Sequence, residues 1–204
     1  MAGASMKDIK LRIKSVESTM QITKAMQLVA TSKLRRAKER MEASKPYGQI
    51  SGAAMAAAVA RCTDPNVPFV TPRSVKRRCY VVIAGERGLA GGYNNNVFKA
   101  VAAHTDGTGY CVLPLGRKAV EKYAHLGVEL LSDQYARVES ISVGSCYAMA
   151  KRLIEGYTRE EFDEIWLAYT SFQSMMTQEV QLEQLLPIRK PETQEPLPVA
   201  AVYE

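Results

Sequence analysis

Residues 6–45 constrain the fold of this chain more than any other stretch. They contain neither glycine nor proline, and alanine, lysine, arginine, methionine, leucine and glutamate dominate them. These side chains lose little conformational freedom in helical geometry, so the stretch predicts one long helix. At about 1.5 Å per residue, roughly 40 residues form a rod about 60 Å long, which is more than the core of one small domain requires.

The apolar residues of this stretch recur in alternating steps of four and three, the heptad spacing of a coiled-coil seam. Ten positions follow that spacing: Ile9, Ile13, Val16, Met20, Thr23, Gln27, Ala30, Leu34, Ala37 and Met41. We predict that the large apolar members form the seam: Ile9, Ile13, Val16, Met20, Leu34 and Met41. A second apolar stripe consists of Ile22, Met26 and Val29. Apolar residues on more than one side indicate more than one partner; the alternative is an ordinary amphipathic helix on its own domain.

Positive charge concentrates in the same stretch. Between Ser5 and Lys45 there are eleven Lys or Arg residues and four acids, a net charge of +7. The chain has 27 basic and 21 acidic side chains, so the remainder holds 16 bases and 17 acids. Three explanations stay open from charge alone: a solvated helix face, a nucleic-acid-binding helix, or docking against an acidic protein surface.

Membrane, secretion and zinc signals are weak in this sequence. No run approaches the roughly 20 apolar residues of a membrane span, and the N-terminal residues lack the apolar core of a secretory signal. The four cysteines are widely spaced without a C-x-x-C pair: Cys62, Cys79, Cys111 and Cys146. We therefore expect free thiols in a reducing cytoplasm and no metal site.

Prolines mark the boundary between two kinds of structure. Pro46 is expected to end or kink the long helix, and the alanine-rich residues 49–61 to resume it. Pro65, Pro68 and Pro72 then predict an extended linker. We assign residues 1–62 to the long N-terminal helix with its continuation after Pro46, residues 63–78 to the linker and residues 79–204 to an α/β domain.

Short apolar runs alternate with helical segments after the linker. Strands are predicted at residues 79–84, 109–115, 128–131, 164–172 and 179–188, and helices at 93–104, 116–125 and 142–157. This alternation favours a doubly wound, largely parallel sheet. The expected fold class is thus α/β: a long N-terminal coiled-coil-forming helix plus a Rossmann-like α/β domain.

A glycine-rich turn at residues 85–92 follows the first predicted strand, a setting in which phosphates often bind. Its spacing, G-x-x-G-x-x-G-G, departs from G-x-G-x-x-G, and no G-K-[ST] follows, so we favour a tight structural turn over nucleotide binding. His104 and His125 lie at predicted helix ends without a partner at a catalytic spacing. We expect no chemistry by this chain itself and no cofactor.

Three segments resemble the F-type ATP synthase gamma subunit family. Residues 8–47 resemble the family's N-terminus, above all I-K-S-V at 13–16, Q-I-T-K-A-M at 21–26 and K-L-R-R-A at 33–37. The loop R-G-L-A-G-G-Y-N at 87–94 is similar to the second signature, with Ala90 where a cysteine is common, and 172–187, ending in E-Q-L-L-P, resembles a third. The matches fall in the family's order and span nearly the whole chain.

The resemblance implies a non-catalytic rotor subunit in the central stalk of a proton-translocating ATP synthase. Its long helix would stand inside a ring of three alpha and three beta subunits. Its α/β domain would contact the epsilon subunit and the membrane ring of proton-carrying subunits. The location implied is the cytoplasmic face of a bacterial cell membrane, with peripheral attachment through the complex.

The resemblance also suggests site residues. Lys24 and Met26 occupy the family's Thr-Lys-Ala-Met segment, which lies near loops of the beta subunits. We expect the beta-subunit contacts to be Lys24, Met26, Val29, Arg35 and Arg36. Tyr203 and Glu204 match the start of the segment that faces the membrane ring.

One departure qualifies the resemblance. The family continues for roughly 80 further residues into a C-terminal helix that pairs with the N-terminal helix, and this sequence lacks that helix. A truncated, non-functional fragment of the gamma subunit is therefore one alternative. A basic helical nucleic-acid-binding protein is another, although residues 6–45 hold no aromatic side chain. A nucleic-acid-binding role also leaves the heptad seam unexplained.

Overall fold

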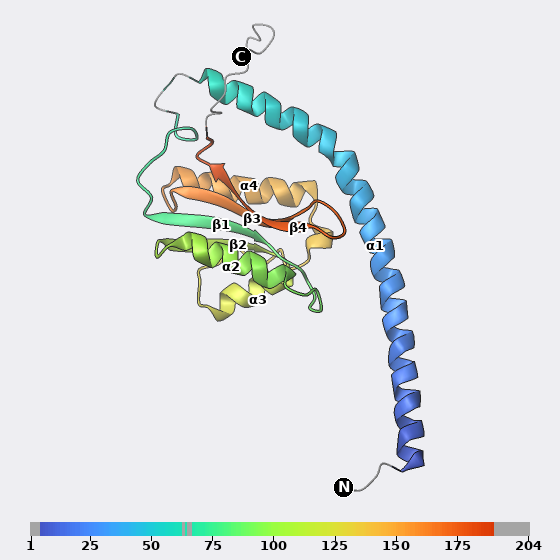
Figure 1. Ribbon diagram of the computed structural model, residues 1–204. Coiled ribbons are helices and arrows are strands. Elements are labelled where there is room, and N and C mark those ends of the chain that lie inside the picture. Colours follow the sequence, from blue (N-terminus) through green and yellow to red (C-terminus); the bar gives the residue numbers. More distant parts are fainter. Residues whose placement is uncertain (1–4, 63, 65–66, 190–204) are drawn as a thin grey trace. The chain divides into compact units, whose positions relative to one another are not determined.

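A computed structural model of the chain describes residues 5–62, 64 and 67–189. The chain divides into two compact units, Met1–Ala58 and Val59–Glu204. The first unit holds most of one long helix, and the second holds a sheet with helices on both faces (Figure 1).

The long helix α1 spans Met6–Arg61, 56 residues with Pro46 in its interior. At about 1.5 Å per residue this corresponds to a rod of roughly 80 Å. The helix therefore does not end at Pro46. Pro46 lacks an N–H, which leaves one carbonyl of the preceding turn without its helical bond, but that turn is exposed and water can supply the missing partner. Figure 1 shows α1 as a single curved ribbon.

Four strands form the sheet of the second unit: β1 (Arg77–Ile83), β2 (Gly109–Leu115), β3 (Glu164–Phe172) and β4 (Gln178–Leu186). Their order across the sheet is β2-β1-β3-β4. Strand β1 pairs in parallel with both β2 and β3, whereas β4 returns antiparallel to β3 through a hairpin. The connections from β1 to β2 and from β2 to β3 run through helices, as parallel pairing requires.

Helices α2 (Tyr93–Thr105) and α3 (Arg117–His125) cover one face, and α4 (Val143–Thr158) covers the other. A 3-10 turn, η1 (Val138–Ser140), precedes α4. Because side chains alternate along a strand, Tyr80 and Val82 of β1 pack toward α2 and α3, while Cys79 and Val81 pack toward α4. The sheet is thus buried on both faces, which explains why its central strands are continuous apolar runs.

The predicted fold class is confirmed: the chain has a long N-terminal helix and a largely parallel, doubly wound sheet. The division at residues 62 and 78 stays a prediction. One strand prediction was wrong, because residues 128–131 form only an isolated parallel bridge between Leu130 and Val112 of β2. Soon after that bridge the chain turns, so that the carbonyl of Tyr135 accepts the N–H of Gly116, and no longer strand can develop.

Gly116 lies closer to neighbouring backbone than any other described glycine. It lies between β2 and α3 with a φ of 96°, and its N–H donates to Tyr135 O. A Cβ at this position would overlap the carbonyl oxygen of Ala84, at the end of the neighbouring strand. Only glycine fits both the backbone conformation and the space.

Arg73 and Asp163 join the segment before β1 to the α4–β3 connection. Arg73 Nε lies 2.9 Å from Asp163 Oδ1, and its Nη2 donates to the carbonyls of Tyr157 and Phe162. The guanidinium also stacks over the ring of Tyr157, 4.2 Å from its centroid. Asp163 Oδ2 accepts the backbone N–H groups of Lys76 (2.8 Å) and Arg77 (3.0 Å). The nearly buried carboxylate thereby fixes the start of β1 beside the start of β3.

We predict that Gly116→Ala lowers the free energy of unfolding by about 3 kcal/mol or more, because strained φ and steric overlap add together. Gly127→Ala is the matched control: Gly127 also has a positive φ, 67°, but open space around its Cβ position, so about 1–2 kcal/mol is expected. Urea denaturation of both variants measures the difference. Equal losses would show that the contact with Ala84 is unimportant.

We predict that Asp163→Asn costs about 2–3 kcal/mol of unfolding free energy, because Arg73 then lacks its counter-charge. Burial alone would raise the pKa of Asp163, but its bonds to the Lys76 and Arg77 amides and to Arg73 outweigh burial and lower that pKa below 3.8. A lowered folded-state pKa stabilises the protein above the ordinary pKa of the group, and this contribution is lost as pH falls through the lowered value.

The advantage of the unsubstituted chain over Asp163→Asn should therefore be full at pH 5 and above and shrink below a pH of about 3.8. Denaturation curves at pH 3 and pH 6 test this, with the exposed Asp133→Asn as the control. A difference that does not change with pH would contradict the assignment.

Candidate partner-binding surfaces

The predicted coiled-coil seam lies exposed on α1. The exposed fraction of its six large apolar side chains runs from 38% at Leu34 to 63% at Met20. The second stripe is equally exposed, with 59% at Ile22, 55% at Met26 and 58% at Val29. Contiguous apolar surface of this kind marks a contact site for other chains.

The predicted beta-subunit contacts do not share one face of α1. At about 100° per residue, Met26 lies roughly a quarter of a turn from the nearby seam positions, and Val29 and Arg36 lie on the same side, roughly a third of a turn or more from them. By the same geometry, Lys24 lies roughly a quarter of a turn from the seam on its other side, and Arg35 roughly a third. Apolar or basic groups therefore point in three directions, and no flat partner surface can meet all of them.

The basic side chains of α1 differ in their partners. Arg35 pairs with Glu39 and Lys38 with Glu42, each at 3.7 Å and one helical turn apart. Neither Lys24 nor Arg36 has an ion pair within the described residues. Exposed pairs of this kind contribute little to stability, so all four cations can turn toward a partner at small cost.

The polar seam position Thr23 is less polar than the sequence indicates. Its hydroxyl donates to the carbonyl oxygen of Thr19 at 2.9 Å, and Thr19 donates to Ser15 in the same way. Thr31 likewise donates to Gln27. Because these hydroxyls are satisfied inside the helix, their methyl groups are available to pack. The sequence reasoning missed this, although threonines four residues after a carbonyl are a readable signal.

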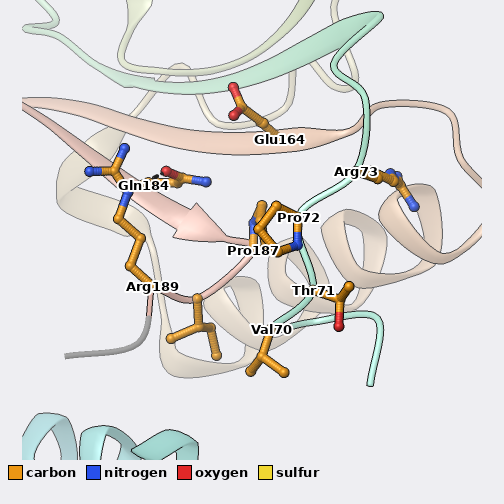
Figure 2. A pocket seen from close by; sticks show the side chains of 9 residues that line it. Val70, Thr71, Pro72, Arg73, Glu164, Gln184, Pro187 and Arg189 are labelled. Atoms are coloured by element: carbon orange, nitrogen blue, oxygen red, sulfur yellow. Dashed lines mark hydrogen bonds between the residues drawn. The ribbon is translucent and has the colours of Figure 1, made fainter. Parts of the chain in front are cut away.

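A hollow of about 620 Å³ lies on the α/β domain where β3 begins and β4 ends (Figure 2). It is lined by Val70, Thr71, Pro72, Arg73, Glu164, Gln184, Pro187, Ile188 and Arg189. Figure 2 shows Gln184 and Arg189 together on one side and Arg73 on the other.

The polar groups that line this hollow bond to other groups of the domain rather than converge on its centre. Glu164 accepts from Arg78 and from Trp166 Nε1, each at 2.9 Å, and Gln184 accepts from Arg189 at 2.7 Å. The carboxylate and the two arginines that line the hollow are thus engaged within the domain. The arrangement indicates a structural edge of the domain rather than a site that holds a small polar ligand.

The glycine-rich turn is occupied by the chain's own groups. The N–H of Gly85 donates to the side-chain oxygen of Asn94 at 2.7 Å, and its carbonyl accepts the N–H of Lys118 at 3.0 Å. At the tip of the turn, Leu89 has a φ of 62° and is almost fully exposed. Self-bonding at Gly85 supports the interpretation of a structural turn.

The two histidines have structural surroundings. His104 lies in the last turn of α2, where Tyr80 Oη and His104 Nδ1 are 2.8 Å apart. Burial, followed by the charge of Arg78, lowers the pKa of His104, and burial raises that of Tyr80 to about 12. His125 is the last residue of α3, as predicted. Both rings belong to helix ends rather than to a catalytic group.

Tyr203 and Glu204, the predicted contacts with a membrane ring, lie outside the described residues. Within the described ranges, no cluster of His, Cys, Asp and Glu has the composition of a metal site. None of the described helices combines the length and apolar content needed to cross a membrane.

Comparison with known proteins identifies the family. A model of the protein family described as ATP synthase matches residues 5–204. The chain is 39% identical over 184 residues to the ATP synthase gamma chain of Heliobacterium modesticaldum, covering 90% of this chain and 63% of that protein. It is 42% identical over 190 residues to the ATP synthase gamma chain of Ruminococcus albus, covering 91% and 66%.

A third relative is the sodium-ion-specific ATP synthase gamma chain of Acetobacterium woodii, 36% identical over 185 residues, with 90% and 61% covered. The chain thus spans a little less than two thirds of the length of these relatives. The central stalk and c-ring structure of the Tetrahymena thermophila mitochondrial ATP synthase matches with a TM-score of 0.59 at 20% identity, covering 86% of this chain and 81% of that one. At that identity the match shows the fold alone.

The long exposed helix, the α/β domain and the family match together define a subunit of the ATP synthase class. Within that class, the chain belongs to the ATP synthase gamma chain family.

We predict that Arg35→Gln and Arg36→Gln leave the thermal unfolding midpoint of the chain unchanged, because both side chains are exposed on α1. Differential scanning calorimetry of each variant tests this. The comparison separates the paired Arg35 from Arg36, and a lowered midpoint for either would show that its role is to stabilise the fold.

Proposed function

We propose that this chain is a rotor subunit in the central stalk of an ATP synthase, where it couples ion flow through a membrane ring to conformational change at the catalytic beta subunits. It performs no chemistry itself. One observation carries the proposal: α1 presents apolar and basic groups on three faces along the same length of helix. A ring of subunits around the helix can contact all three faces, whereas a single neighbour cannot.

Coupling requires contacts that differ between rotor positions. A rotor shifts a beta subunit between conformations only if it binds one conformation more strongly than another. Because Met26 and Lys24 lie on opposite sides of α1, each of the surrounding subunits meets a different group at any one angle. Lys24 supplies a mobile positive contact to acidic loops, and Met26 a deformable apolar one. Val29 and Arg36 extend the Met26 face, and Arg35 extends the Lys24 face.

The remaining interfaces follow from the same role. The seam from Ile9 to Met41 receives a partner helix, as its heptad spacing indicates. The α/β domain binds the epsilon subunit and the membrane ring, with Tyr203 and Glu204 toward the ring. This places the chain at the cytoplasmic face of a bacterial cell membrane, attached through the complex. Protons are the ion that we propose, although one relative carries a sodium-specific name.

Co-expression with the alpha and beta subunits of its own source tests the assembly. Native mass spectrometry should detect a complex of three alpha subunits, three beta subunits and one copy of this chain. The double variant Ile13→Asp and Leu34→Asp should weaken that complex, because it places charges in the seam. Only free chain, or only self-associated chain, in the unsubstituted sample would contradict the proposal.

Met26→Lys should reduce the number of protons pumped per ATP hydrolysed by the assembled complex more than it reduces the rate of hydrolysis. A lysine at position 26 replaces the deformable apolar contact with a charged one. The torque-bearing interaction is therefore lost, while the catalytic sites of the beta subunits stay intact. Simultaneous assays of ATP hydrolysis and proton pumping in membrane vesicles measure the ratio.

Met55→Lys is the matched control, since Met55 is also on α1 and is 54% exposed against 55% for Met26. It lies outside the proposed contact set, so pumping per ATP should stay at the unsubstituted value. An unchanged ratio for Met26→Lys, or an equal loss for both variants, would count against the role assigned to Met26.

A further inference from the structure

The two edges of the sheet differ in how their backbone groups are used. On the β2 edge, Val112 donates its N–H to the carbonyl of Glu129, and its own carbonyl accepts the N–H of Leu131, both at 2.9 Å. Glu129 is held there by an ion pair with Arg77. A segment of the chain thus blocks the middle of this edge.

The backbone of the opposite edge strand, β4, bonds only to β3 within the described residues. Gln173 donates its N–H to Thr177 O next to the hairpin turn, so the pairs that exchange hydrogen bonds are Ser171 with Glu179 and Tyr169 with Gln181. Bonded and non-bonded positions alternate along the strand, so Val180 and Leu182 direct their N–H and C=O groups away from the sheet. These groups form a free hydrogen-bonding edge.

Apart from its two exposed glutamates and an irregularity near its far end, this edge has few of the features that protect a sheet edge from pairing. Strand β4 has nine residues and contains neither lysine nor proline. The irregularity in its pairing with β3 lies near its far end, between Ile165 and Trp166, which leaves residues 178–183 in regular register. An exposed edge of this length and regularity is a template for an added strand.

Charge and burial indicate which strand can be added. Glu179 and Glu183 project from the same face of β4 and are exposed, while Val180 and Leu182 pack on the opposite face against the core beneath α2. At the hairpin tip beside them, Met175 is 66% and Met176 is 95% exposed. The edge therefore offers two carboxylates about 13 Å apart, free backbone groups and an apolar end.

A second copy of this chain is a poor occupant. Two β4 strands paired edge to edge would bring their glutamates onto one shared face, and like charges across a strand pair are destabilising. A strand with lysine or arginine at alternate positions would instead place cations beside Glu179 and Glu183.

We propose that β4 is a docking edge for an extended, basic segment of another protein, which adds to the sheet as a further strand. Backbone hydrogen bonds at Val180 and Leu182 provide the affinity, and Glu179 and Glu183 select basic side chains. This inference does not depend on the proposed function, because it concerns only the sheet.

The first test uses two fluorescent eight-residue peptides, acetyl-(Lys-Val)₄-amide and acetyl-(Glu-Val)₄-amide, titrated into the full chain while anisotropy is measured. The lysine peptide should bind at least about tenfold more tightly than the glutamate peptide, and its affinity should fall as salt rises. The double variant Glu179→Lys and Glu183→Lys should bind it at least about tenfold more weakly.

Glu17→Lys combined with Asp133→Lys makes the same change in net charge at exposed positions that are not part of β4 and should bind like the unsubstituted chain. Equal weakening by both double variants would show that overall net charge, and not Glu179 and Glu183, determines the affinity for the lysine peptide, and would overturn the proposal. Failure of the lysine peptide to bind the unsubstituted chain would also overturn it.

Amide hydrogen exchange, followed by NMR, tests the proposal on the unsubstituted chain alone, so misfolding of a variant cannot affect the result. Peptide addition should slow the exchange of the Val180 and Leu182 amides at least about tenfold, while Glu179 and Gln181, already bonded to β3, should change little. Uniform slowing, or protection of Val180 and Leu182 before any peptide is added, would overturn strand addition.

Discussion

Apolar side chains on more than one side of α1 determine how this helix can be buried, and therefore how the molecule binds its partners. A helix that packs on one domain needs a single apolar stripe, and the opposite side can be polar. Here the seam from Ile9 to Met41 and the stripe from Ile22 to Val29 are separated by roughly a third of a turn. Both are exposed. The free energy of burying them is therefore still available to whatever packs against α1, and that is what makes α1 a recognition element.

In the α/β domain, by contrast, the buried and half-buried charged groups are satisfied by partners within the domain. Asp163 accepts two backbone amides and pairs with Arg73. Arg78 pairs with Glu164 and donates to two carbonyls at the end of α2. Each network joins segments distant in sequence, and a buried charge with a missing partner would be costly. The result is a domain whose internal contacts are fixed and whose remaining capacity for binding lies at its surface and edges.

Local sequence pattern predicted most elements of the fold. Strands β2 and β3 were predicted with the bounds that the structure shows, since both are apolar runs buried on two faces. Residues 128–131 carry a similar pattern, but tertiary contacts allow only one bridge there. Pro46 was expected to end or kink the helix before residues 49–61 resume it, and the helix continues through it because exposure removes most of the cost. The miss at residues 128–131 arises because neighbours, not local preference, decide the outcome.

The two candidate binding surfaces, on α1 and at the β4 edge, differ in how far the sequence could predict them. Helical periodicity alone separates Lys24 and Arg35 from Met26 and Val29, so the three-faced character of α1 is present in the sequence. The free edge of β4 is not, because it depends on the strand order β2-β1-β3-β4 and on which edge residues 128–131 cover. Sequence shows the alternation of Glu179, Val180, Leu182 and Glu183, but only the topology shows that nothing described lies beside it.

The two kinds of surface suit two kinds of contact. Those on α1 are made by methionine, aliphatic and long cationic side chains, whose attraction depends little on direction. Such contacts can be exchanged for similar ones as a helix turns within a ring. Strand addition at β4 is directional and holds a partner in one register, because each backbone bond requires a specific geometry. The rotor role proposed for this chain needs the first kind of contact toward the subunits that the helix passes and the second kind toward any companion that turns with it.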